Sequence, residues 1–230
     1  MAFLDDLRPF YGTGEKNRDG ESLEEFLTHY DPKKYDCPSN TTDIVVVRCR
    51  EPLTCWGQPL EVLLVKRSNH PSIGCWATPG GFVELKEDLE AGAARELEEE
   101  TGVKGLPLKQ LTTWGNYNRD PRWRVITTSF LALAEGDIPV KAGDDADDAL
   151  WFSVSLTQVS PQPKEVWKLE LSNARQSIFL HAQVQIHRSA HPLLTQERYE
   201  LLESDGIAVD HGCIITQALF DLKEKLEASH

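Results

Sequence analysis

Two continuous apolar runs predict the strands of the first half of the chain. IVVV lies within residues 43–50 and VLLV within residues 60–67. A strand with one covered face alternates apolar and polar residues, so these unbroken runs predict strands buried on both faces. Less regular apolar stretches predict further strands at 108–117, 124–133 and 150–154.

A two-residue alternation sets residues 178–187 apart from those runs. Apolar side chains at every second position alternate with mostly polar ones: Ile178, Leu180, Ala182, Val184 and Ile186 against Phe179, His181, Gln183, Gln185 and His187. This period predicts a strand that pairs with residues 166–171 in a β-hairpin, inserted at 155–206. The apolar face of such a hairpin must be covered by the body of the domain or by a second subunit, so a homodimer is one of the two arrangements.

Three segments carry helix signals. Residues 22–30 predict a short helix within an N-terminal arm that spans 1–40. Residues 88–101 begin at an aspartate suited to the N-cap and end before Gly102, which suits the left-handed position after a helix. Apolar residues at helical spacing predict a terminal helix within 207–230. Strands and helices together predict an α/β domain over residues 41–230.

Composition narrows the classes of function. The chain has 230 residues, of which 40% are hydrophobic, enough for one large domain with a real core. A net charge of −13 argues against binding to a nucleic-acid backbone. No apolar run approaches the length of about 18 residues that predicts a membrane span, and the N-terminus lacks the features of a signal peptide. Five scattered cysteines without a CxxC spacing predict reduced thiols in a cytoplasmic protein and no zinc site.

The segment GFVELKEDLEAGAARELEEETGV, residues 81–103, concentrates acidic side chains at the end of the predicted helix. Carboxylates there oppose the helix dipole, and Glu96 with Glu100 is a like-charge pair, each effect costing up to about 1 kcal/mol. Glu96, Glu99 and Glu100 fall within an arc of roughly 100°. Hard divalent cations take oxygen ligands of this kind, so the pattern predicts a metal site. The alternative is a solvated acidic face on a glutamate-rich helix.

Residues 81–103 match the Nudix box, G-x5-E-x7-R-E-U-x-E-E-x-G-U with U aliphatic, at every fixed position. The chain therefore resembles the Nudix hydrolase superfamily. The segments VLLVKRSN, GCWATPGGFVE, NRDPRWRVITTSFLAL, GDDADDALWF and IAVDHGCII are similar to its ADP-ribose-pyrophosphatase-like branch. The resemblance implies an α/β/α sandwich with a mixed sheet, to which this chain adds the inserted hairpin.

The resemblance also implies roles for single residues. Glu96, Glu99 and Glu100, with the backbone carbonyl of Gly80, would ligate Mg²⁺ or Mn²⁺. Glu96 or Glu99 would be the catalytic base, although in some branches that base lies on a later loop, for which the chain offers Asp144, Asp145, Asp147 and Asp148. Four positions of the motif would be structural: Gly81, Gly102, and Glu87 with Arg95 as an ion pair.

Outside the box, three arginines are candidates for binding substrate. Arg67 ends a predicted strand close to the box and could meet a phosphate. Arg122 and Arg124 alternate with Trp123, which predicts that both point to one face as a phosphate or ribose clamp. Each has an alternative as a surface cation. Trp114 and Trp123 stack an adenine or pack in the core, with packing the commoner fate. His211 is expected to be a cap or a surface residue.

These observations predict an enzyme that hydrolyses a pyrophosphate bond in a nucleoside diphosphate linked to another group, most simply ADP-ribose to AMP and ribose 5-phosphate. The expected partner is this small-molecule nucleotide, with neither nucleic acid nor membrane. One alternative is a hydrolase of modified nucleoside triphosphates. Another is a non-catalytic sensor that binds ADP-ribose; in this branch such sensors carry a following winged-helix domain, for which we expect no room before His230.

Overall fold

The computed structural model describes residues 2–143, 146–161, 164–189, 191 and 196–229, in two compact units, Met1–Cys37 and Pro38–His230. The smaller unit holds the 3-10 turn η1 (Arg8–Phe10) and helix α1 (Leu23–His29). Ser22 begins α1 with a capping box, because its hydroxyl accepts the N–H of Glu25 while the Glu25 carboxylate accepts the N–H of Ser22. The short helix predicted at 22–30 is confirmed.

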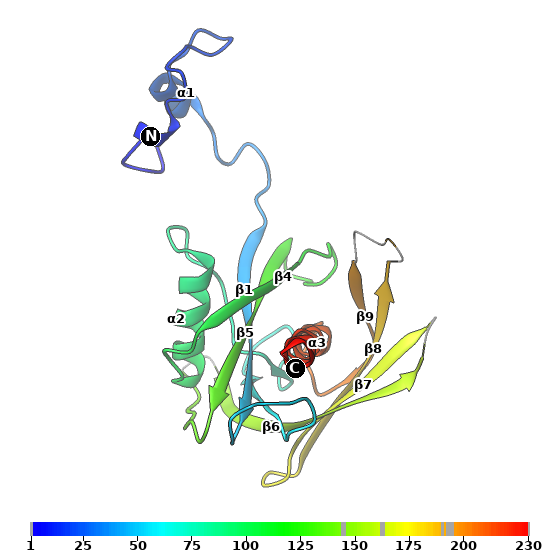
Figure 1. Ribbon diagram of the computed structural model, residues 1–230. Coiled ribbons are helices and arrows are strands. Elements are labelled where there is room, and N and C mark those ends of the chain that lie inside the picture. Colours follow the sequence, from blue (N-terminus) through cyan, green and yellow to red (C-terminus); the bar gives the residue numbers. More distant parts are fainter. Residues whose placement is uncertain (1, 144–145, 162–163, 190, 192–195, 230) are drawn as a thin grey trace. The chain divides into compact units, whose positions relative to one another are not determined.

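One sheet organises the larger unit (Figure 1). Its strands run in the order β4-β5-β1-β2-β6-β7-β8-β9, with β3 paired to β2. The bounds are β1 (Ser39–Cys49), β2 (Glu61–Arg67), β3 (Trp76–Ala77), β4 (Leu108–Trp114), β5 (Val125–Glu135), β6 (Ala146–Ser160), β7 (Glu165–Asn173), β8 (Ile178–Arg188) and β9 (Glu197–Asp205). The sheet is mixed, since β1 and β5 are parallel and the other pairs of named strands are antiparallel.

Two helices cover opposite faces of this sheet, α2 (Leu89–Thr101) and α3 (His211–Ala228). The apolar run of β1 explains why both faces need a cover. Ile44 and Val46 join the core cluster that contains α2 residues, whereas Val45 and Val47 join the cluster that contains α3 residues. The predicted strands buried on both faces and the predicted α/β fold class are confirmed, as are the helices at 88–101 and at the C-terminus.

The segment after β6 continues the sheet and curls it around α3 (Figure 1). The predicted hairpin is confirmed as β7 and β8, with Leu169 opposite Ala182. The strand predicted at 150–154 is longer, because one part of β6 pairs with β2 and the remainder with β7. The sequence did not predict β9, which pairs with β8 along one side and has few apolar positions.

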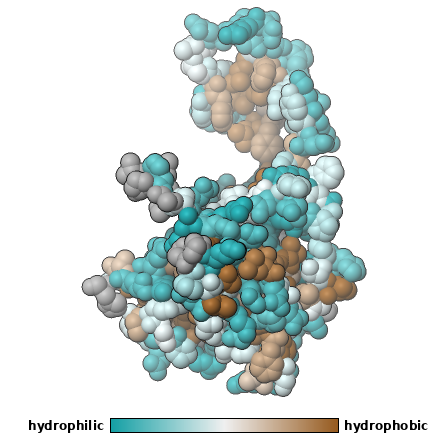
Figure 2. Space-filling view, turned by 90° about the vertical axis from the view of Figure 1, so that its right-hand side faces the viewer, coloured by the Kyte–Doolittle hydropathy of each residue, from teal (hydrophilic) through white to brown (hydrophobic). Residues whose placement is uncertain are grey.

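The apolar face of the hairpin lies against α3, within the body of the larger unit. Trp167 of β7, for example, contacts the ring of Phe220 edge-on at a centroid distance of 5.0 Å. The opposite face carries ion pairs such as His187 with Glu200, and the surface in Figure 2 is mostly hydrophilic with smaller apolar areas. Among the described residues, no helix combines the length and apolarity needed to cross a membrane.

Candidate active site

An ion pair folds the loop before α2 back onto that helix. Arg95 donates from Nε to Glu87 Oε1 at 2.8 Å and from Nη2 to Glu87 Oε2 at 2.9 Å. These bonds lower the pKa of Glu87 to about 2. Gly92 makes room for the pair, since a Cβ there would lie 2.9 Å from Glu87 Oε2. The small residue in this turn therefore accommodates the loop, a role that helix geometry alone did not suggest.

Two consecutive glycines allow the loop after β3 to pass close to β1 and to the carboxylates of α2. Gly80 has a φ of +154°, and a Cβ on it would lie 2.0 Å from the carbonyl oxygen of Thr42. Its N–H donates to Glu100 Oε2 at 2.9 Å. At Gly81, a Cβ would lie 2.4 Å from a carboxylate oxygen of Glu96. Helix α2 ends as predicted at Gly102, which has a φ of +71°.

A pocket opens beside α2, and only two of the three predicted metal-binding carboxylates line it. Glu96 and Glu100 do so, whereas the side chain of Glu99 is 58% exposed and accepts a hydrogen bond from Arg95 at 2.9 Å. No group of three or more His, Cys, Asp or Glu side chains converges as a metal cluster within the described residues. The box therefore presents a pair of carboxylates to the pocket, with Glu99 beside it.

Burial makes the charged forms of this pair unfavourable. Desolvation raises the pKa of Glu100 from its ordinary value of 4.5 to about 7, and the charges of Glu96 and Asp43 add to the rise. Desolvation also raises the pKa of Glu96, although Arg95 opposes it at 2.8 Å. A divalent cation fits here because it stabilises both carboxylates, and Mg²⁺ commonly joins one or two carboxylates to a substrate phosphate.

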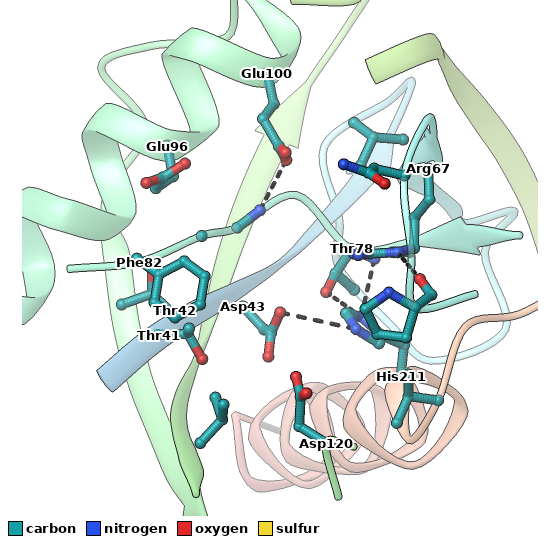
Figure 3. Close-up of a pocket in the computed structure, with 18 of the residues that line it drawn as sticks. Thr41, Thr42, Asp43, Arg67, Thr78, Phe82, Glu96, Glu100, Asp120 and His211 are labelled. Atoms are coloured by element: carbon teal, nitrogen blue, oxygen red, sulfur yellow. Dashed lines mark hydrogen bonds and ion pairs between the residues drawn. The ribbon is translucent and has the colours of Figure 1, made fainter. Parts of the chain in front are cut away.

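The pocket has a volume of about 440 Å³ and opens beside α2 (Figure 3). Two of the three predicted substrate-binding arginines line it. Arg67 is held by Pro71, whose carbonyl oxygen accepts its Nε–H at 2.7 Å. Arg122 pairs with Asp120 at 2.8 Å and lies over the ring of Phe82, 5.5 Å from its centroid.

One side of the pocket is formed by residues of the Nudix box and the glycine before it. We call these residues, Gly80, Gly81, Glu96 and Glu100, the box wall.

Arg124 does not line this pocket. The strand alternation expected for Arg122 and Arg124 is wrong, because residues 121–123 form bends and β5 begins at Val125. Trp123, 55% exposed, and Trp114 also lie outside the pocket. Trp114 contacts the core and donates its indole N–H to the hydroxyl of Ser129. The structure thus separates the predicted aromatic candidates from the carboxylate pair.

The pocket is also lined by four polar residues with largely buried side chains, Asp43, Thr78, Arg119 and His211, and we call them the far wall. Figure 3 shows Asp43, Thr78 and His211 across the pocket from Glu96. Of the four, the sequence singled out only His211. His211, expected as a cap or surface residue, is buried at the start of α3. Its Nδ1 lies 2.8 Å from the Thr78 hydroxyl. Arg119 bonds Asp210 through Nε and Nη2 at 3.0 and 2.9 Å. One signal was visible in the sequence: Asp43 stands at the head of a strand predicted to be fully buried.

The residue that precedes the aspartates considered as a later catalytic base lies near the end of α2. Gly143 donates its N–H to the carbonyl oxygen of Glu100 at 2.9 Å, which brings the start of this segment to the box helix. Asp144 and Asp145 lie outside the described residues, as does the side chain of Asp147. Asp148 accepts the N–H of Ala149 at 2.9 Å. The identity of the base therefore stays a prediction.

Comparison with known proteins relates this geometry to a family. The NUDIX domain family model matches residues 41–172. An ADP-ribose pyrophosphatase of Methanocaldococcus jannaschii is 42% identical over 95 residues, which are 41% of this chain and 56% of that protein. The ADPR responsive transcriptional repressor NtrR of Acinetobacter baylyi is 40% identical over 114 residues, 49% of this chain and 43% of the repressor. The chain thus spans about half the length of these relatives.

Solved structures share the fold. A MutT/nudix family protein from Enterococcus faecalis superposes with a TM-score of 0.64 at 31% identity, covering 89% of this chain and 70% of that one. The NUDIX domain of Shewanella oneidensis NrtR, in its cocrystal with ADP ribose, gives a TM-score of 0.58 at 27% identity, covering 88% and 99%. The resemblance predicted from residues 81–103 is confirmed.

Proposed function

Because the chain belongs to the Nudix domain family, we propose that it is a metal-dependent pyrophosphohydrolase of nucleoside diphosphates linked to a further group. ADP-ribose is the proposed substrate, hydrolysed to AMP and ribose 5-phosphate. The observation that carries this proposal is the half-buried pair Glu96 and Glu100, which lines a pocket together with Arg67 and Arg122. Carboxylates and guanidinium groups in one pocket suit a substrate that brings phosphates and a cation together.

Glu96, Glu99 and Glu100, with the Gly80 carbonyl, are the proposed ligands of Mg²⁺ or Mn²⁺. A cation bound there supplies a Lewis acid for the pyrophosphate and lowers the pKa of a bound water. For Glu99 to take part, it must leave its hydrogen bond with Arg95. Arg67 and Arg122 hold the phosphates in line for attack, and Glu96 or Glu99 accepts the proton of the attacking water. The water oxygen forms a new bond to one phosphorus of the pyrophosphate, and the bond from that phosphorus to the bridging oxygen breaks. The second phosphate then leaves with the bridging oxygen.

The choice of ADP-ribose rests on size and on relatives. A pocket of about 440 Å³ lies within the range of roughly 300–1,000 Å³ that suits small-molecule ligands. The similar proteins include ADP-ribose pyrophosphatases from Methanocaldococcus jannaschii and Saccharomyces cerevisiae, and a NUDIX domain crystallised with ADP ribose. A cytoplasmic location, homodimer formation and the absence of nucleic-acid partners stay predictions.

A second candidate function is an ADP-ribose sensor without turnover. Its support is the similarity to the repressor NtrR and the wide structural overlap with the NUDIX domain of NrtR. A sensor has no need of an intact set of box glutamates, and this chain retains Glu96, Glu99 and Glu100. That retention favours the enzyme.

A substrate panel with and without cation separates these functions. We expect release of AMP and ribose 5-phosphate from ADP-ribose in Mg²⁺ or Mn²⁺, and none in a chelator. Tight binding of ADP-ribose without products would replace the enzyme with the sensor. Turnover restricted to nucleoside triphosphates would instead indicate a hydrolase of modified nucleotides.

A further inference from the structure

We propose that Asp43 and His211 form a subsite that recognises one ribosyl hydroxyl of the substrate. The inference rests on the proposed function, because it concerns the sugar of the same nucleoside diphosphate. It extends that function by assigning the choice of sugar to the far wall.

Hydrogen bonds to His211 fix where its ring carries a proton. The backbone N–H of Thr78 points at Nδ1 from 3.2 Å, so Nδ1 accepts. The Thr78 hydroxyl reaches the same nitrogen at 2.8 Å. A ring whose Nδ1 accepts carries its proton on Nε2. His211 therefore presents an N–H donor on the side of Asp43, as the dashed line in Figure 3 indicates.

The Asp43 carboxylate keeps its acceptor capacity for a ligand. The residue is only 7% exposed, yet within the described chain no hydrogen bond reaches its carboxylate. The nitrogens of Arg119 and His211 that face it are too distant for hydrogen bonds, with Arg119 Nη2 at 3.7 Å and His211 Nε2 at 4.0 Å. Asp43 lines the pocket, so its carboxylate can accept a hydrogen bond from a ligand bound there.

A donor and an acceptor 4.0 Å apart are complementary to a hydroxyl group. A hydroxyl oxygen at about 2.8 Å from both atoms would accept from His211 Nε2–H and donate to Asp43. A phosphate would be repelled by Asp43, and an ammonium group would leave the His211 donor without an acceptor. The chemistry therefore selects an alcohol, and in ADP-ribose, the proposed substrate, every alcohol is a ribosyl hydroxyl.

The Arg119–Asp210 pair fixes the position of this subsite. Asp210 precedes α3 and caps none of its N–H groups; its carboxylate bonds Arg119 at both oxygens. The side chain of Arg119 is 8% exposed, so this contact ties the loop between β4 and β5 to the residue before His211. Because Arg119 is engaged by Asp210, its longer contact to Asp43 leaves that carboxylate open to the substrate.

The test pairs a variant with substrate analogues. We would measure kcat and KM, and the calorimetric Kd, for ADP-ribose and for analogues that each lack one hydroxyl, of either the adenosine ribose or the terminal ribose. The wild type should lose about 10- to 100-fold in affinity for one of these analogues, and its identity distinguishes the two riboses. The Asp43→Asn variant should bind ADP-ribose about 10- to 100-fold more weakly than the wild type does. Its affinity for the analogue that lacks the recognised hydroxyl should be close to that of the wild type for the same analogue. Asp137→Asn, an exposed carboxylate, is the matched control.

Two results would overturn the subsite: wild-type binding that is indifferent to every deoxy analogue, or an Asp43→Asn variant that weakens all of them equally. Equal losses in kcat across the analogues would place Asp43 in the chemical step instead. The analogue series in the wild type decides the matter even if Asp43→Asn does not fold. Failure of the wild type to bind or hydrolyse any nucleoside diphosphate sugar would overturn the proposed function itself, a separate outcome.

Discussion

The box wall takes its carboxylates from one turn of α2, whereas the far wall collects residues from β1, the end of β3, a loop and the start of α3. Their charges are also balanced differently. Asp210, beside the far wall, has Arg119 bonded to both oxygens. On the box wall, Glu100 has one backbone N–H as its hydrogen-bond donor, and burial raises its pKa to about 7. Arg119 thus neutralises Asp210 beside the far wall, and we propose that an external cation neutralises the carboxylates of the box wall.

The largest effect that can test this comparison is on catalysis. Glu100→Gln keeps the shape of the side chain but removes the charge that a cation would neutralise. We expect kcat to fall roughly 10³-fold, because metal-assisted stabilisation supplies several kcal/mol to such reactions. Steady-state hydrolysis of ADP-ribose in saturating Mg²⁺ measures the loss.

Glu98→Gln is the matched control for that experiment. Glu98 lies in the same helical turn, but its side chain is 51% exposed, pairs with Lys104 at 3.0 Å and lines no part of the pocket. Its substitution should leave kcat unchanged. Equal losses in the two variants would mean that the acidic turn acts only through its overall charge, and full activity of Glu100→Gln would remove the proposed metal site.

On the far wall the largest expected effect is on stability. Arg119→Met removes one partner of a largely buried ion pair and leaves Asp210 without its counter-ion. We expect the free energy of unfolding to fall by about 3 kcal/mol. Urea denaturation followed by circular dichroism would measure it.

Arg122→Met provides the contrast, since the Arg122 side chain is 46% exposed whereas that of Arg119 is 8% exposed. Solvent around the Arg122 guanidinium weakens its ion pair, but Asp120 is only 9% exposed, so we expect a loss smaller than that of Arg119→Met and not zero. A loss below 1 kcal/mol in Arg119→Met would contradict the assignment of Arg119 as the internal counter-ion of the far wall.

The same contrast explains what could be predicted from the sequence. The box helix, its Gly102 end and the Glu87–Arg95 contact depend on neighbours within 23 positions, so local rules located them. Arg119 and His211 lie 76 and 168 positions beyond Asp43, and only the folded domain brings the three together. The sequence did not predict strand β9, because its apolar residues that pack in the core are only Tyr199 and Leu201, among charged residues. Two apolar positions are too few to produce a recognisable strand pattern. Local patterns predicted the acidic turn that we propose as a cation site, whereas only the tertiary structure assembles the far wall.

The last prediction concerns pH. The folded protein binds a proton at Glu100 with a pKa of about 7, whereas the ordinary value is 4.5. The unfolded chain therefore releases this proton at lower pH, and the free energy of unfolding should decrease as pH rises from about 4.5 to 7, then level off. The slope from one proton is at most about 1.4 kcal/mol per pH unit. Denaturation in a chelator at several pH values measures it.

Adding Mg²⁺ tests whether the pH dependence of stability arises from Glu100 on the box wall. Mg²⁺ binds the deprotonated carboxylate, so adding it should stabilise the folded protein most near pH 7 and flatten the decline. Glu100→Gln should lack this contribution to the slope in the chelator and respond less to Mg²⁺. Wild type and variant could instead show the same dependence of the free energy of unfolding on pH in the chelator. That result would mean that Glu100 is not the group whose charge is unfavourable in the folded protein. The proposed contrast between the two walls would then be wrong.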